Sequence, residues 1–175
     1  MNAAELFVQC LEAEGVKHIF GVPGEENAHF LMALERSPIQ FVVTRHEQAA
    51  AFMAETHGKL TGEAGVCLGT LGPGATNLVT GVADANSDRA PVVVITGQAD
   101  VQRQHKESHQ HIDTVSMFRP ITKMATPIIH PDNIPEVVRQ AFKQATREKP
   151  GACHIELPDD IAALPATRRP VAKNY

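Results

Sequence analysis

One carboxylate, Glu47, occupies a position from which a side chain can reach a bound ligand. It follows the apolar run Phe41-Val42-Val43, which predicts a strand, and it opens a segment of small residues that predicts a helix over 47–60. Ligands of open parallel sheets bind at the carboxyl ends of strands, where this prediction places Glu47. A glutamate in the first turn is also a common helix-start signal, favoured by the helix dipole. The segment alone therefore leaves two interpretations open, a catalytic acid or a helix-start residue.

Two glycine-rich loops follow other predicted strands. Gly21-Val22-Pro23-Gly24 is a turn, and Gly69 to Gly74 separates a short apolar strand from the next helix. The second loop is not a Walker loop, because no Gly-Lys-Ser/Thr follows, and its spacing does not match a dinucleotide fingerprint. It is either a tight strand-to-helix turn or a binding loop. Because parallel strands end at one edge of a sheet, we expect both loops to meet Glu47 there.

Three histidines in one polar segment, His105, His109 and His111, suggest a metal site. Zinc sites usually add a clear fourth ligand or a His-Glu-x-x-His helix, and the segment offers neither. We therefore predict no metal ligand in this chain. A hydrolase elbow of the form Gly-x-Ser-x-Gly does not occur either.

Composition excludes several classes of protein. The 175 residues carry a net charge of −4 without a long Lys/Arg cluster, which argues against nucleic-acid and membrane partners. No apolar run approaches the roughly 20 residues of a membrane span, and the first residues do not resemble a signal peptide. Cys10, Cys67 and Cys153 are widely spaced in apolar segments, which indicates buried thiols rather than a disulfide framework. We expect a cytoplasmic protein.

Strand and helix patterns alternate along the chain. Alternation of this kind implies a parallel sheet covered by helices on both faces. Because crossovers between parallel strands are right-handed, the possible topologies are reduced to a doubly wound α/β fold. We expect a six-stranded, mostly parallel sheet with strands at 16–20, 40–43, 65–68, 91–97, 121–124 and 152–157. Helices are expected at 2–15, 26–36, 47–60, 75–86 and 113–118, and after Asn133, which is predicted to cap the last helix with Glu136 in a capping box.

The composition changes after Pro158-Asp159-Asp160. Residues 163–175 contain two prolines and the pair Arg168-Arg169, which is typical of a linker. We expect a domain over residues 1–162, followed by a linker toward a middle domain of a longer protein.

Three of these stretches together resemble the pyrimidine-binding domain of thiamine diphosphate enzymes. They are Phe20-Gly21-Val22-Pro23-Gly24, Arg45-His46-Glu47-Gln48-Ala49-Ala50 and Gly72-Pro73-Gly74-Ala75-Thr76-Asn77. The resemblance covers about Ala3 to Ile161 and implies the thiamine diphosphate-binding fold. Within this family the chain looks most like the acetolactate synthase large subunit, and Ser108 to Asp113 is closest to the catabolic type. Further support comes from Pro91–Gly97, Arg119–Lys123 and Ile155–Asp160.

The resemblance implies a role for each of these positions. The family's glutamate that matches Glu47 shares a proton with the pyrimidine ring, which activates the cofactor for attack on a 2-keto acid. The glutamine that matches Gln110 lies near the reacting carbon. The residues expected to line the cofactor, besides Glu47, are Val22, Pro23, Gly24, Thr70, Gly72, Pro73, Gly74 and Asn77.

The resemblance also implies partners that this chain does not supply. The family binds the diphosphate and its Mg²⁺ on another domain through a Gly-Asp-Gly motif, which is absent from this sequence. Its active site forms between this domain and the diphosphate-binding domain of a partner subunit in a homodimer or tetramer. We therefore expect the isolated chain to be inactive. FAD, where the enzyme carries it, would bind in the middle domain.

The resemblance implies 2-keto acids as the substrates. We expect pyruvate as the donor 2-keto acid and a second 2-keto acid as the acceptor, in acetoin or branched-chain amino acid metabolism. Glu55-Thr56-His57-Gly58-Lys59 and Leu71 depart from the family's usual pattern. The alternatives are another 2-keto acid decarboxylase or oxidase of the family, or a non-catalytic assembly module.

Overall fold

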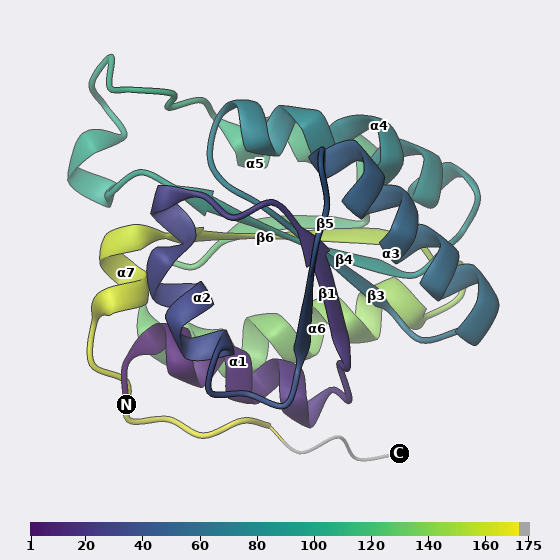
Figure 1. Cartoon of the computed structure of the whole chain (residues 1–175), viewed down its shortest axis with the longest axis horizontal. Coiled ribbons are helices and arrows are strands. Elements are labelled where there is room, and N and C mark those ends of the chain that lie inside the picture. Colours follow the sequence, from purple (N-terminus) through teal and green to yellow (C-terminus); the bar gives the residue numbers. More distant parts are fainter. Residues whose placement is uncertain (172–175) are drawn as a thin grey trace.

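Six parallel strands form one sheet in the order β2-β1-β3-β4-β6-β5 (Figure 1). Every neighbouring pair is parallel, so the predicted doubly wound α/β fold is confirmed and the sheet is parallel throughout. The computed structural model describes residues 1–171. The strands are β1 (His18–Gly21), β2 (Gln40–Val43), β3 (Gly65–Gly69), β4 (Val92–Gln98), β5 (Met124–Pro127) and β6 (Ala152–Pro158).

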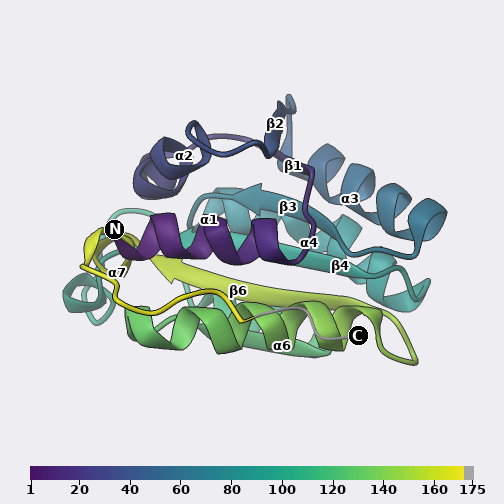
Figure 2. The same ribbon diagram turned by 90° about the horizontal axis from the view of Figure 1, so that it is seen from below.

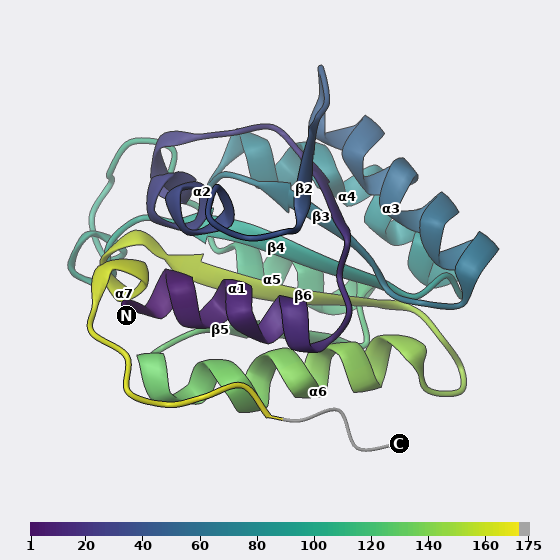
Figure 3. The ribbon, with the colours of Figure 1, turned by 60° about the horizontal axis from the view of Figure 1, so that its bottom comes forward.

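Helices cover both faces of the sheet. Figure 2 shows α1 (Ala3–Ala13) and α6 (Ile134–Thr146) lying side by side on one face. Figure 3 shows α3 (Glu47–Thr61) beside α4 (Pro73–Ser87) on the other. The remaining helices are α2 (Ala28–Leu34), α5 (Thr114–Phe118) and α7 (Asp159–Ala163), with α2 and α7 packed on the α1 side and α5 on the α4 side.

The direction and handedness of the crossovers between strands explain which helices cover which face of the sheet. The chain leaves β1 for β2 at the edge and then returns past β1 to β3. Right-handed crossovers that run in opposite directions place their helices on opposite faces of the sheet. The structure has α2 on the α1 side and α3 on the α4 side. The direction changes at β1, so the space above the carboxyl ends of β1 and β3 is a switch point of the topology, where doubly wound folds bind ligands.

The central strands are buried on both faces. In β4, Val93 and Ile95 pack into the core beneath α1 and α6, whereas Val92 and Val94 pack into the core beneath α3 and α4. This accounts for the unbroken apolar run of that strand. Cys10, Cys67 and Cys153 are all free and buried, as predicted, and burial raises the pKa of each thiol to about 12.

Several boundaries and one cap differ from the sequence predictions. The fifth strand was expected at 121–124, but Arg119–Ile121 forms a 3₁₀ turn and β5 begins at Met124. Pro120 in that turn has no N–H for a strand ladder. Asn133 makes no side-chain cap, because it ends a 3₁₀ turn, Pro131–Asn133, that His130 caps instead. The predicted helix at 26–36 begins with another 3₁₀ turn, Glu25–Asn27, before α2.

The end of the described chain lies against its beginning. Ala3 N donates to Leu164 O at 2.8 Å, and Ala166 N donates to Met1 O at 3.1 Å. The domain boundary at residue 162 stays a prediction, and residues 172–175 of the expected linker lie outside the described residues. Within residues 1–171, no helix has the length and apolar character needed to cross a membrane.

A buried histidine makes the stability of this fold depend on pH. His154 on β6 is fully buried, stacks on Phe118 and shares a hydrogen bond of 2.8 Å with Thr96 Oγ1. Burial lowers the pKa of His154 to about 3. The unfolded chain binds a proton at this residue near pH 6.5, which the folded chain does not, so the free energy of unfolding falls as the pH drops below about 6.5.

Replacing His154 with glutamine tests this dependence. Glutamine can keep a hydrogen bond to Thr96 but binds no proton. Between about pH 6 and pH 4, we expect the wild-type free energy of unfolding to fall about 1.4 kcal/mol per pH unit more steeply than that of the variant. Urea unfolding at several pH values measures both slopes. Parallel slopes would contradict a neutral, buried His154.

Candidate functional site

The predicted site residues gather at the carboxyl ends of β1, β2 and β3. We call this edge the β1–β3 rim and define it by residues 22–24, Glu47 and residues 70–77. Three strand ends contribute to it, as the sequence predicted. One boundary differs, because α4 begins at Pro73 rather than Ala75. Pro73 and Gly74 therefore belong to the first turn of α4, where proline is well tolerated.

Glu47 is the buried acid of the rim. His46 caps α3 by accepting a hydrogen bond of 3.1 Å from Gln48 N, so Glu47 is the first residue of the helix. Glu47 is only 8% exposed, and its Oε2 accepts a 2.9 Å hydrogen bond from Asn77 Nδ2 on α4. Within residues 1–171 this is the only hydrogen bond to the carboxylate, so Oε1 has no protein donor. A carboxylate that is nearly buried and has one oxygen without a protein donor is suited to a polar ligand group.

Thr70 joins the loops after β1 and β3. Its hydroxyl donates to Glu26 Oε2 at 3.1 Å. A Cβ on Gly24 would collide with the Thr70 side chain, and a Cβ on Gly74 would lie 2.7 Å from its methyl group and 3.5 Å from Glu47 Oε1. Both glycines therefore allow an approach that no other residue permits. Sequence reasoning missed Glu26, although two acids directly after the Gly-Val-Pro-Gly turn are a detectable signal.

Gln110 reaches the rim through its backbone. Gly72 has φ +50°, and a Cβ there would collide with the carbonyl oxygen of Gln110. Gln110 itself has φ +57°, which is uncommon for a residue with a side chain. Its side chain is exposed at the edge of the rim. The structure thus brings Gln110 to the loop that precedes α4.

Two of the predicted cofactor residues in the rim are less buried than Glu47. Val22 is half-buried, and its N–H donates to Leu68 O at 3.4 Å. Pro23 is exposed and lines a shallow apolar hollow with Phe41 and Val43. No hydrogen bond within residues 1–171 links either of them to Glu47.

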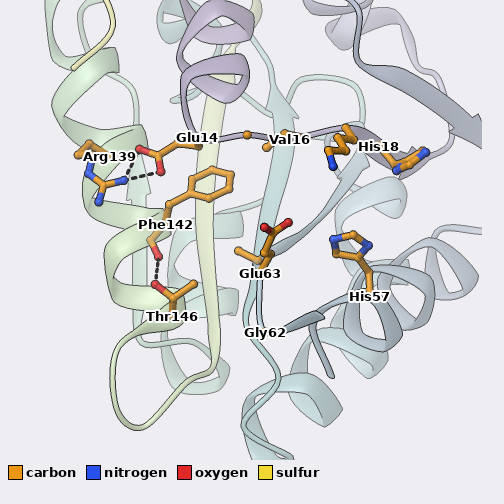
Figure 4. Close-up of a pocket in the computed structure, with 12 residues that line it drawn as sticks. Glu14, Val16, His18, His57, Gly62, Glu63, Arg139, Phe142 and Thr146 are labelled. Carbon is orange, nitrogen blue, oxygen red and sulfur yellow. Dashed lines mark hydrogen bonds and ion pairs between the residues drawn. The ribbon is translucent and has the colours of Figure 1, made fainter. Parts of the chain in front are cut away.

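A partly enclosed hollow lies at the opposite edge of the sheet, away from the rim. It has a volume of about 240 Å³ (Figure 4). Glu14 and Arg139 form an ion pair across it, with Oε1 2.6 Å from Nη1, and so join α1 to α6. The hollow contains none of the predicted site residues. We assign it a structural role.

The three histidines do not form a metal site within residues 1–171. His111 Nδ1 instead shares a hydrogen bond of 3.1 Å with Gln98 Oε1. The cluster with ligand-like spacing in this part of the chain is Glu55, Asp84 and Asp88. The ammonium of Lys59 already lies in it, 2.6 Å from Glu55 and 2.7 Å from Asp88.

The fold and the rim define a class of protein, a doubly wound α/β domain with a carboxylate at its switch point. A family profile described as "Thiamine pyrophosphate enzyme, N-terminal TPP binding domain" matches residues 1–117. The chain therefore belongs to this family of thiamine pyrophosphate-binding domains, and the resemblance predicted from the sequence is confirmed.

Relatives narrow the comparison to one type of enzyme. A probable acetolactate synthase large subunit from Methanocaldococcus jannaschii is 48% identical over 161 residues, which is 92% of this chain and 27% of the relative. A catabolic acetolactate synthase from Raoultella terrigena is 43% identical over 97% of this chain and 32% of the relative. An acetolactate synthase from Bacillus subtilis is 43% identical over 91% and 28%. The chain thus spans about a third of these relatives or less.

Proposed function

We propose that the β1–β3 rim binds the pyrimidine ring of thiamine diphosphate and that Glu47 is the acid that hydrogen-bonds this ring. The observation that carries the proposal is the nearly buried Glu47 carboxylate. Asn77 holds one of its oxygens, and within residues 1–171 the other oxygen has no protein hydrogen-bond partner. A polar ring that both donates and accepts hydrogen bonds fits this set of groups. When bound, the cofactor supplies an electron sink for cleavage beside a keto group.

The other rim residues have supporting roles in this proposal. Asn77 holds the carboxylate in one orientation, which lowers the entropic cost of binding. Gly24, Gly72 and Gly74 let backbone and ligand approach closely. Thr70 holds the β1 and β3 loops together through Glu26. Val22, Pro23 and Pro73 form the outer apolar wall, and Gln110 reaches over the edge toward the substrate.

We further propose that the whole protein is an acetolactate synthase-like enzyme. Support comes from the relatives, which are acetolactate synthases with 43–48% identity over nearly all of this chain. In this proposal the donor substrate is pyruvate, and acetoin or branched-chain amino acid metabolism uses the product. The diphosphate and Mg²⁺ bind to a separate domain of a partner subunit in a homodimer or tetramer, with FAD in the middle domain of those members that carry it. The three buried thiols are consistent with a reducing cytoplasm.

An assay of the full-length protein with pyruvate tests this function. We expect acetolactate as the product. Release of acetaldehyde would favour a decarboxylase, and turnover of pyruvate that depends on an oxidant would favour an oxidase. A folded protein that shows no turnover of pyruvate would favour an assembly module.

The 175-residue chain alone is expected to show no turnover and to bind thiamine diphosphate weakly, because the rim can hold the pyrimidine but not the diphosphate. Calorimetry with the cofactor and Mg²⁺ measures this affinity. Micromolar binding would contradict the division of the cofactor between two domains.

A further inference from the structure

A buried polar network lies beneath the segment that carries Gln110, at the carboxyl ends of β4 and β6. Its members are Gln98 at the end of β4, Glu156 on β6 and Thr114 at the start of α5, which are 1%, 4% and 0% exposed. None of them belongs to the β1–β3 rim. Buried polar groups are costly unless their hydrogen bonds are made, so the bonds of this network show what it holds in place.

The hydrogen bonds fix the orientation of the Gln98 amide. The backbone N–H of Ala99 can only donate, and it lies 2.9 Å from the oxygen assigned as Gln98 Oε1. The amide nitrogen must then donate its two hydrogens, and it has two acceptors at 3.0 Å, Glu156 Oε2 and the Ile112 carbonyl oxygen. His111 Nδ1 is 3.1 Å from Gln98 Oε1, so the ring must carry its proton on Nδ1.

Glu156 holds both Gln98 and Thr114 by hydrogen bonds. Its Oε2 accepts from the Gln98 amide and from the Thr114 hydroxyl. Burial raises the pKa of Glu156, and the bonds from Thr114 and Gln98 oppose that rise. Through Gln98, the carboxylate holds the backbone of Ile112 and the ring of His111, and through Thr114 it holds the first residue of α5. Apart from the bond from Ala99 N, the bonds that Gln98 and Glu156 make outside β4 and β6 all end on residues 111–114, directly after Gln110.

We propose that Glu156 is a positioning residue that acts through Gln98 and Thr114 to hold Gln110 at the β1–β3 rim. The proposal rests on the proposed function, in which Gln110 faces the substrate. Gln110 has positive φ, and its carbonyl oxygen packs against Gly72. Such a conformation persists only where surrounding contacts over-determine it. The network supplies those contacts on one side and Gly72 supplies them on the other.

Two substitutions at Glu156 separate positioning from packing in the full-length enzyme. Leucine at position 156 removes both acceptor bonds and leaves the Gln98 amide and the Thr114 hydroxyl without a partner. Glutamine keeps one oxygen that can accept both bonds. We expect Glu156→Leu to lower kcat for pyruvate about 10- to 100-fold, since small displacements of a positioned group have effects of that size. We expect Glu156→Gln to restore kcat close to that of the wild type.

Hydrogen exchange of the peptide that covers residues 108–114 provides a readout that does not depend on turnover. Glu156→Leu should lose protection there, and Glu156→Gln should keep it. Thr96→Val is the matched control, because it also removes a buried hydrogen bond between side chains of β4 and β6, the one to His154, without touching the 110–114 segment. It should lower stability and leave both kcat and the exchange of this peptide unchanged.

Several outcomes would overturn the proposal. One is unchanged hydrogen exchange at 108–114 in a folded Glu156→Leu variant. Another is a Glu156→Gln variant whose kcat is as low as that of Glu156→Leu. A third is a Thr96→Val variant that changes kcat and exchange as much as Glu156→Leu does. If Glu156→Leu does not fold, Thr114→Val, which removes one of the two bonds, must show the same local loss of protection. If hydrogen exchange changes as expected while turnover is unaltered in both the Glu156→Leu variant and Glu47→Gln, the result would support the positioning network and contradict the proposed function.

Discussion

Replacing Glu47 with glutamine is expected to slow the reaction of the full-length enzyme by about 10²–10⁴-fold while the domain stays folded. Glutamine has the size of glutamate, and its oxygen can still accept the hydrogen bond from Asn77 that the carboxylate accepts at 2.9 Å. Packing of α3 against α4 should therefore change little. The amide cannot share a proton as a carboxylic acid does, so the step that needs this proton loses its acid.

Proton exchange at the reactive carbon of the cofactor, followed by NMR, measures this effect directly. The matched control is Glu136→Gln, because Glu136 is a first-turn acid of α6, is exposed, and lies outside the rim. Its ion pair with Arg168, at 2.7 Å, is also exposed, and such pairs contribute only about 0–1 kcal/mol. A residue that acts only through the helix dipole contributes about 0.3–1 kcal/mol to stability. Glu136→Gln should show that small loss and normal exchange. If Glu47→Gln also showed only a small loss of stability and normal proton exchange, Glu47 would act as a helix-start residue and not as a catalytic acid.

Replacing Gly72 with alanine is expected to displace Gln110 and to lower kcat about 10²-fold. Gly72 has φ +50°, and a Cβ there would collide with the carbonyl oxygen of Gln110. That oxygen belongs to the backbone, so no side-chain rotation relieves the collision. The two segments must separate, and overpacking of this kind typically costs about 1–3 kcal/mol of stability.

Gly62→Ala separates the collision from backbone strain. Gly62 also has positive φ, +74°, but nothing lies within 4 Å of the position of its Cβ. It caps the far end of α3, away from the rim. Both variants therefore carry the cost of a side chain at positive φ, but only Gly72→Ala also carries the collision. Steady-state kinetics and urea unfolding of both proteins test this difference, and equal losses of activity would contradict a role for the contact between Gly72 and Gln110.

The sequence by itself determined the elements and the class of the fold. The strand over 91–97 and the helix start at Glu47 are local features, and the structure places both within one residue of the prediction. Alternating elements and right-handed crossovers then leave few topologies. The convergence of three strand ends at one edge follows from that topology, which is why the neighbourhood of Glu47 was predictable.

Local sequence patterns did not predict the element boundaries correctly where short 3₁₀ turns replace the start of a strand or helix. Arg119–Ile121 and Pro131–Asn133 both form 3₁₀ turns that contain a proline, and these turns delay β5 and remove the expected Asn133 cap. A proline is compatible with a helix start, a turn or an edge strand, so the sequence signal is ambiguous. Only the surrounding contacts, such as the bond from Thr122 Oγ1 to Phe118 O, decide among these conformations.

The partners of the site side chains were decided by the tertiary structure alone. The sequence indicated Glu47 and Asn77 separately, but their hydrogen bond depends on how α3 packs against α4. Glu156 is 46 positions from Gln110, and its control of the 110–114 segment requires β6 to insert between β4 and β5. Residues distant in sequence meet only through helix packing and strand order, whereas caps and hydrophobic periodicity act over a few residues. The sequence therefore indicated which residues we propose for the chemistry of this domain, and the fold decided what holds each of them in place.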